Sequence, residues 1–197
     1  MVRSSALLVL IALTASNSAL AESESKLSFA DLRVQAGVAD TTGPSAAITL
    51  MCGDIGNANQ HAIDVNEDLG IVLGVRGTLL RTDMTVLGTD ITERLVGGEF
   101  LIGLGIYAGP RDHVELAGGY HIGVLGASGD NQHFRKNGTY RGFGGELGWY
   151  HTWKSHLQFG LLAGYSARTV RVDITDGSRA SVNVNGLDAA ISLGYRF

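Results

Sequence analysis

Apolar and polar residues alternate without interruption over the last seven positions of the chain, from Ile191 to Phe197. A repeat of two residues is typical of a β-strand that has one apolar and one polar face. The apolar face here ends on two aromatic residues, Tyr195 and Phe197. Aromatic rings favour the interface between a membrane and water, so this pattern predicts a strand that faces lipid.

The same alternation recurs along the chain and predicts eight strands. Most of these segments reach the ~9–11 residues that a tilted transmembrane strand requires, whereas strands of soluble proteins are usually shorter. Lipid cannot satisfy the open edge of a sheet, so the strands must close into a ring. The predicted fold is all-β, an eight-stranded antiparallel up-and-down transmembrane β-barrel. The predicted strands are Leu27–Val38, Ser45–Gly53, Asp68–Leu80, Arg94–Ala108, His113–Ala127, Thr139–Trp153, His156–Val170 and Asn183–Phe197.

The predicted connections alternate in length, as they do in outer-membrane barrels. Two are tight turns, at residues 109–112 and 154–155, and three are longer polar links, at Arg81–Glu93, Ser128–Gly138 and Arg171–Val182. An even number of strands then places both ends of the barrel domain in the periplasm. The first hairpin fits this scheme poorly, because Ala39–Pro44 is short and Asp54–Glu67 is long.

The first 21 residues have the features of a secretory signal peptide. Arg3 supplies a positive charge, a short apolar run follows, and Ala19-Leu20-Ala21 matches the pattern of small residues at a cleavage site. We therefore expect residues 1–21 to be a signal peptide and residues 22–197 to be the barrel domain. The formal net charge of −4 gives no indication of nucleic-acid binding.

Charged residues at inward positions of the predicted strands must be paired inside so narrow a barrel. The predicted register places Glu99 beside His121, with Arg76 on its other side and Glu146 at a similar height. We expect Arg76, Glu99, His121 and Glu146 to form one interior polar network that plugs the lumen. Two other interpretations of this cluster are a proton-responsive gate at His121 and a metal site, although no metal-ligand spacing is evident. Five further charged residues are also predicted to point inward: Arg33, Glu115, Arg168, Asp188 and Arg196.

The sequence lacks the features that an enzyme on such a scaffold would need. Nucleophilic catalysis requires a hydroxyl group, a histidine and a carboxylate in contact, and the His-x-Ser motif of outer-membrane lipid A deacylases is absent. His151 is predicted to face lipid between Trp149 and Trp153, where a structural role suffices. We expect no catalytic residues, no cofactor and no metal.

The whole pattern resembles the small eight-stranded outer-membrane barrels, among them OmpX and the membrane domain of OmpA. The alternating C-terminal residues Ile191, Leu193, Tyr195 and Phe197 resemble the signal by which the barrel-assembly machinery recognises such proteins. The resemblance implies a monomer in the bacterial outer membrane, in contact with lipids and lipopolysaccharide, with a structural or surface-interaction role.

Two other functions remain open: a narrow channel or transporter for small solutes, and a lipid A-modifying enzyme. The predicted outer links are shorter than the strand-extended loops of OmpX-type adhesion barrels, which weakens that particular analogy.

Overall fold

The computed structural model describes residues 27–39, 43–55, 69–107, 111–126, 134–174 and 177–197. The predicted signal peptide lies outside these residues, as does most of the polar segment 54–67. In the described part of the chain, no helix is long and apolar enough to cross a membrane.

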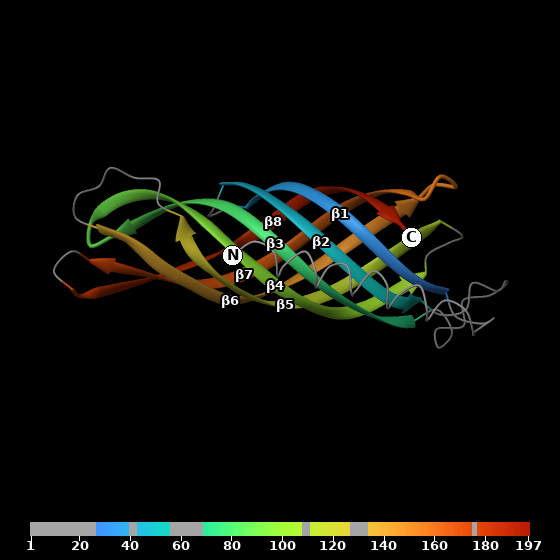
Figure 1. Ribbon diagram of the computed structural model, residues 1–197, viewed down its shortest axis with the longest axis horizontal. Helices are drawn as coiled ribbons and strands as arrows, with labels where there is room; N and C mark the ends of the chain where they lie inside the picture. The colour runs from blue at the N-terminus through green and yellow to red at the C-terminus, as the bar shows by residue number, and fades with distance from the viewer. Residues whose placement is uncertain (1–26, 40–42, 56–68, 108–110, 127–133, 175–176) are drawn as a thin grey trace, which may run out of the picture.

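Eight antiparallel strands form a closed barrel, in which each strand pairs with the next and β1 pairs with β8 (Figure 1). The predicted all-β, up-and-down fold is confirmed. The strands are β1 (Leu27–Ala39), β2 (Gly43–Ile55), β3 (Leu69–Val86), β4 (Thr89–Tyr107), β5 (Asp112–Gly126), β6 (Phe134–Thr152), β7 (Leu157–Ile174) and β8 (Arg179–Arg196). We call the end at which β1 begins and β8 finishes the terminal end, and the opposite end, where β3 turns into β4, the hairpin end.

Outward side chains are apolar and exposed around the whole barrel, from the terminal end to beyond its middle. We call this surface the apolar belt. Exposed apolar groups on this scale are rare on soluble proteins and mark a surface that meets another apolar phase. Its members include Leu32, Val34, Ile48, Ile71, Val75, Leu79, Val96, Phe100, Ile102, Leu104, Leu116, Ile122, Phe143, Leu147, Leu161, Tyr165, Leu187, Ile191 and Leu193.

Two of the predicted outer links are wrong, because they are β-strands in the structure. β3 continues to Val86 and β4 begins at Thr89, so residues 81–93 form a long hairpin with a two-residue turn. Most of the predicted link 171–182 likewise belongs to β7 and β8, and β6 begins at Phe134. These strands therefore extend well beyond β1 and β2, in contrast to the short loops expected from the sequence.

The prediction fails at these links because the alternation continues there with its two faces exchanged. On β3, Arg81, Asp83 and Thr85 point outward and are exposed, whereas Met84 and Val86 point inward and are buried. The side chains still alternate with a period of two. The apolar residues now occupy the inward positions, whereas in the apolar belt they occupy the outward ones. The polar residues that indicate a loop in the sequence form the outer face of a strand, as they do in soluble proteins.

The inward apolar residues of these extensions pack together and fill the lumen at the hairpin end. At the hairpin end, β1 does not extend beyond Ala39, and β2 begins only at Gly43. Farther toward the hairpin end, β3 contacts β8, although the two strands are not paired. Ala180 and Val182 pack against the buried set, which we call the hairpin-end cluster. It comprises Leu80, Met84, Val86, Ile91, Leu95, Leu125, Tyr140, Val170, Val172 and Val184.

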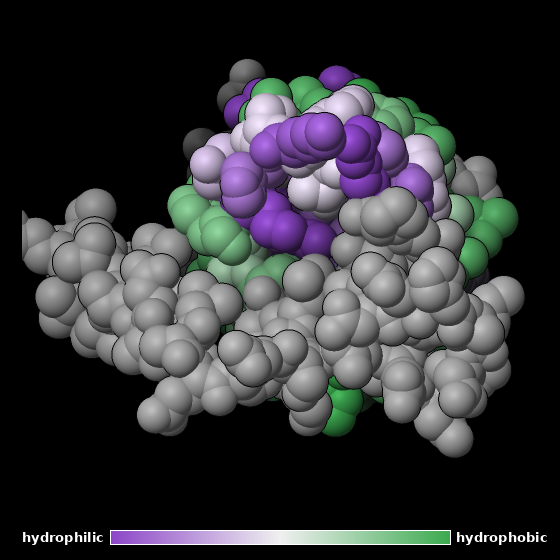
Figure 2. Space-filling model, turned by 90° about the vertical axis from the view of Figure 1, so that its right-hand side faces the viewer, coloured by the Kyte–Doolittle hydropathy of each residue, from purple (hydrophilic) through white to green (hydrophobic). Residues whose placement is uncertain are grey.

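The turn between β3 and β4 has the geometry of a tight hairpin. Leu87 and Gly88 both have positive φ, at 50° and 78°. This is the conformation of a two-residue type I′ turn, which suits glycine and strains a leucine. The opposite end of the barrel has a different surface: Figure 2 looks onto the terminal end and shows hydrophilic residues along the uncovered part of the rim, with hydrophobic residues on the flanks.

Candidate functional site

The four residues of the predicted interior network lie in contact near the middle of the lumen. The Arg76 guanidinium donates to Glu146, with 2.8 Å between Nη1 and Oε2, and to Glu99, with 3.2 Å between Nη1 and Oε2. Its Nε donates to Thr49 Oγ1 at 2.9 Å. Arg76 on β3 thus joins β2, β4 and β6. We call Arg76, its partners Thr49, Glu99 and Glu146, and the adjacent His121 the central network.

His121 occupies the position that the predicted register assigns to it. It is the β5 partner of Glu99, and its Nδ1 lies 3.5 Å from Glu99 Oε2. The ring lies against the backbone of β6, because a side chain at Gly144 would come within 2.6 Å of His121 Nε2. That Nε2 atom has no hydrogen-bond partner among the described residues. The glycine therefore makes the room that the imidazole occupies.

A second charge network lies nearer the terminal end and was not predicted. Arg33 on β1 reaches across the lumen to Glu115 on β5, with Nη1–Oε2 and Nη2–Oε1 distances of 2.7 and 2.6 Å. The same guanidinium donates to Asp31 at 2.7 Å, and Arg196 donates to Asp31 through two nitrogens at 2.8 and 2.9 Å. We call this set, with His113, the terminal-end network.

The terminal-end network is the more deeply buried of the two. Arg33 and Asp31 are 0% exposed and Glu115 is 2% exposed. The Tyr150 ring covers the Arg33 guanidinium, with 4.0 Å from Cζ to the ring centre, and stacks on His113. The terminal half of the lumen is therefore filled by paired charges under an aromatic ring.

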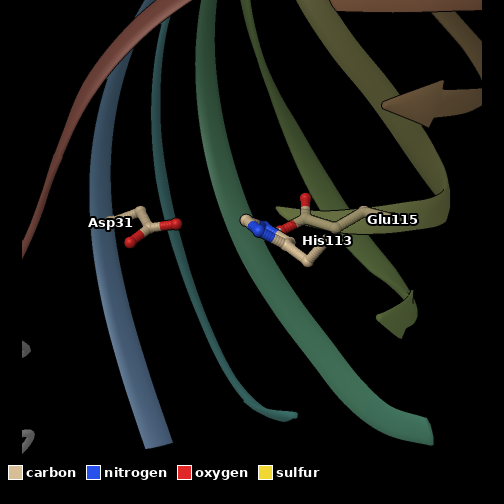
Figure 3. A group of neighbouring side chains, drawn as sticks. All are labelled: Asp31, His113 and Glu115. Atoms are coloured by element: carbon tan, nitrogen blue, oxygen red, sulfur yellow. The ribbon is translucent and has the colours of Figure 1, made fainter. Parts of the chain in front are cut away.

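Asp31, His113 and Glu115 also form the one group of potential metal ligands found in the described part of the chain, with ligand atoms within 4.8 Å of one another. Figure 3 shows Asp31 reaching from β1 toward His113 and Glu115, which both come from β5. However, two arginines already donate to these carboxylates, and their positive charges repel a cation. The arrangement fits a salt-bridge cluster better than a metal centre.

A cavity of about 80 Å³ separates the central network from the hairpin-end cluster. Arg76, Glu146 and His121 line one side of it, and Leu80 and Arg168 line another. Its volume has room for several water molecules. The lumen is therefore layered, with paired charges at the terminal end, a small cavity bordered by the central network in the middle, and apolar packing at the hairpin end.

The remaining sequence-derived residues lie at the positions expected of them. Ile191, Leu193, Tyr195 and Phe197 point outward and are exposed, and the rings of Tyr195 and Phe197 are in edge contact. His151 faces outward between Trp149 and Trp153, and its Nδ1 lies 2.9 Å from Asp112 Oδ1. Ser166 donates to Asp188 at 2.8 Å, and Arg168 Nη2 lies 3.6 Å from the same carboxylate.

The residues that sequence reasoning missed are those that meet across the lumen. Asp31 and His113 were not considered as site residues, and Arg33, Glu115 and Arg196 were assigned to the interior without partners. β1 and β5 are not neighbours in the barrel, so no pairing register relates them. One signal was present in the sequence: all five residues fall at inward positions within a few residues of the same end of their strands.

Comparisons with known proteins assign no family to this chain. No family model matches it, and no curated protein matches it. Among solved structures, it is similar to one described as the crystal structure of a major outer membrane protein from Thermus thermophilus. That alignment has 14% sequence identity and a TM-score of 0.45, and it covers 87% of this chain and 100% of the other.

Proposed function

We propose that this protein is an integral barrel of the bacterial outer membrane with a closed lumen, and that it serves a structural or surface-interaction role. The observation that carries the proposal is the apolar belt, which is continuous around the barrel and gives way to strand extensions with polar outward residues at the hairpin end. Such a belt is stable in lipid and would aggregate in water.

Direct contact with lipid is the first test of this proposal. Spin labels or lipid-soluble quenchers should reach cysteines placed at Ile102 and Leu161, which are exposed on the belt, and should miss those placed at Leu101 and Leu162, which face the lumen. Each pair differs by one residue on the same strand, so the neighbours act as matched controls. Equal quenching within a pair would contradict the proposal.

Recognition by the barrel-assembly machinery remains a proposal that rests on the C-terminal strand. Phe197→Asp should leave the chain in the periplasm, because it places a charge at the end of the exposed aromatic pair. A conservative control is Phe197→Trp. Normal outer-membrane yield of the Asp variant would contradict this assignment, and cell fractionation with heat-modifiable gel migration measures it.

The surface role is supported by the strand extensions beyond the apolar belt. β3, β4, β7 and β8 continue past β1 and β2 at the hairpin end, and they carry exposed polar side chains on their outer face, among them Asp83 and Asn185. A polar surface beyond the belt would be accessible to an extracellular protein. Replacing residues 82–93 by an Asn-Gly turn should abolish adhesion of cells to extracellular proteins while leaving outer-membrane yield intact.

The channel alternative finds less support in the lumen. The terminal-end network and the hairpin-end cluster fill the lumen on either side of the small cavity. We expect no conductance in planar bilayers from the whole barrel, because the terminal-end network fills one end of the lumen and the hairpin-end cluster fills the other. Steady conductance of the unaltered protein would favour the channel alternative instead.

A further inference from the structure

Two arginines face each other directly on the outer surface of the barrel. Arg81 on β3 and Arg94 on β4 are cross-strand partners, and both point outward and are exposed. Like charges at directly opposed positions of a sheet destabilise it. The pair therefore lowers the stability of the barrel unless something negatively charged lies against it.

No carboxylate of the described residues forms a salt bridge with either arginine. Neither Arg81 nor Arg94 has an acidic group within 4.0 Å in this part of the chain, whereas Arg179 pairs with Asp173 at 3.0 Å. Asp83, the next outward residue of β3, accepts a hydrogen bond from Thr92 and contacts neither guanidinium within salt-bridge distance. The two guanidinium groups thus remain available to a ligand.

The position of the pair indicates what that ligand is. On β3 the last exposed apolar residue before Arg81 is Leu79, and on β4 the residue next to Arg94 on the same face is Val96. The arginines are therefore the first polar side chains beyond the apolar belt. On β6, Arg141 lies next to Phe143 on the outward face in the same way. In a membrane this height is that of the lipid headgroups.

We propose that Arg81 and Arg94 bind the phosphomonoester group of a membrane lipid. Guanidinium groups recognise phosphate through paired hydrogen bonds, and a phosphomonoester carries a charge of about −1.5 to −2 near neutral pH. Two arginines match that charge, whereas a phosphodiester headgroup carries about half of it. The proposal rests on the membrane location proposed above and adds the chemistry of the lipid at the hairpin end.

The test uses the protein folded in neutral maltoside micelles, which do not depend on insertion into a bilayer. Phosphatidic acid, phosphatidylglycerol and diacylglycerol with the same acyl chains are titrated into the micelles, and bound lipid is counted by native mass spectrometry. We expect phosphatidic acid to bind most tightly. The double variant Arg81→Gln/Arg94→Gln should lose about 25-fold in its affinity, or about five-fold for each arginine at about 1 kcal/mol.

The matched control is Arg111→Gln/Arg179→Gln, which removes the same charge from exposed arginines elsewhere. It should keep the affinity of the wild type. Loss of affinity in the control as well, equal binding of the three lipids, or unchanged binding by the Arg81/Arg94 variant would overturn the proposal.

The unfolding midpoint of the same variants is a second measurement, and its predicted change has opposite signs without and with phosphatidic acid. Without phosphatidic acid, Arg81→Gln should raise the unfolding midpoint in urea, because it removes a like-charge contact. With phosphatidic acid, it should lower that midpoint relative to the wild type. A change of the same sign in both conditions would overturn the proposal, whereas failure of the wild type to enter bilayers would count only against the membrane location.

Discussion

The two halves of this barrel are built on opposite rules. In the half that carries the apolar belt, apolar side chains point outward and paired charges fill the lumen. In the strand extensions at the hairpin end, charged and polar side chains point outward and the hairpin-end cluster fills the interior. β3 contains both arrangements, with Val75 outward and Arg76 inward, and then Arg81 outward and Met84 inward.

The difference shows how the surrounding solvent decides which face of a strand is apolar. The backbone and its register are continuous from one half to the other, so on the membrane location proposed above only the phase that meets the outer face changes. In lipid the outer face must be apolar, and any charge inside needs a partner. In water the usual arrangement returns, and burial of apolar side chains stabilises the strands.

The strongest test of this comparison is the loss of a buried charge from the belt half. Arg33→Met should destabilise the barrel by about 3–5 kcal/mol, because it strands Asp31 and Glu115 without a partner. Arg76→Met should cost less, since Arg76 borders a cavity that has room for water. Urea unfolding in detergent or vesicles measures both, and equal costs would indicate that the two networks are solvated alike.

A double-mutant cycle sharpens that test. Arg33→Met combined with Glu115→Gln should cost less than the sum of the two single changes, because the two side chains meet through two hydrogen bonds. Additive costs would mean that this contact across the lumen does not form.

Truncation of the apolar interior at the hairpin end should have the next largest effect. Leu95 is 0% exposed within the hairpin-end cluster, so Leu95→Ala should cost about 2–5 kcal/mol through lost burial and a new cavity. Opening of the hairpin should appear as faster amide exchange in residues 81–94, with the belt half unaffected. Uniform exchange throughout the barrel would show that the two halves do not unfold separately.

Arginine on the outer face distinguishes the two halves directly. Leu104→Arg, in the belt, should cost about 2–4 kcal/mol if the residue lies near the bilayer midplane. Asn185→Arg, an outward and exposed position beyond the belt, should change stability by less than about 0.5 kcal/mol. Similar costs in lipid vesicles would contradict the assignment of the two surfaces to two different phases.

A smaller effect than that of Leu104→Arg is predicted for the hairpin turn. Leu87→Asn should stabilise the β3–β4 hairpin by about 0.5–1 kcal/mol, because asparagine tolerates the positive φ that strains leucine. Gly88→Ala is the opposing variant and should destabilise it, although the space around Gly88 is open. Local amide exchange is the measurement, and a stabilising Gly88→Ala change would contradict the turn geometry.

The alternation of side chains was enough to predict the barrel, the number of strands and the orientation of the belt residues. Neighbour contacts followed as well, since the tight turn after β4 sets the register that brings Glu99 to His121. Local pattern succeeds in these cases because strand period and adjacent register depend on residues close together in the sequence.

Only the tertiary structure decided which side chains meet across the lumen and where the strands end. Arg33 and Glu115 are 82 residues apart and lie on strands that do not pair, so their contact depends on the closure and diameter of the barrel. The extensions of β3 and β8 are buried on one face because they contact each other above the shorter β1 and β2. The sequence determined the local alternation of faces, whereas closure of the ring determined which face points out of the barrel and which meets the opposite wall.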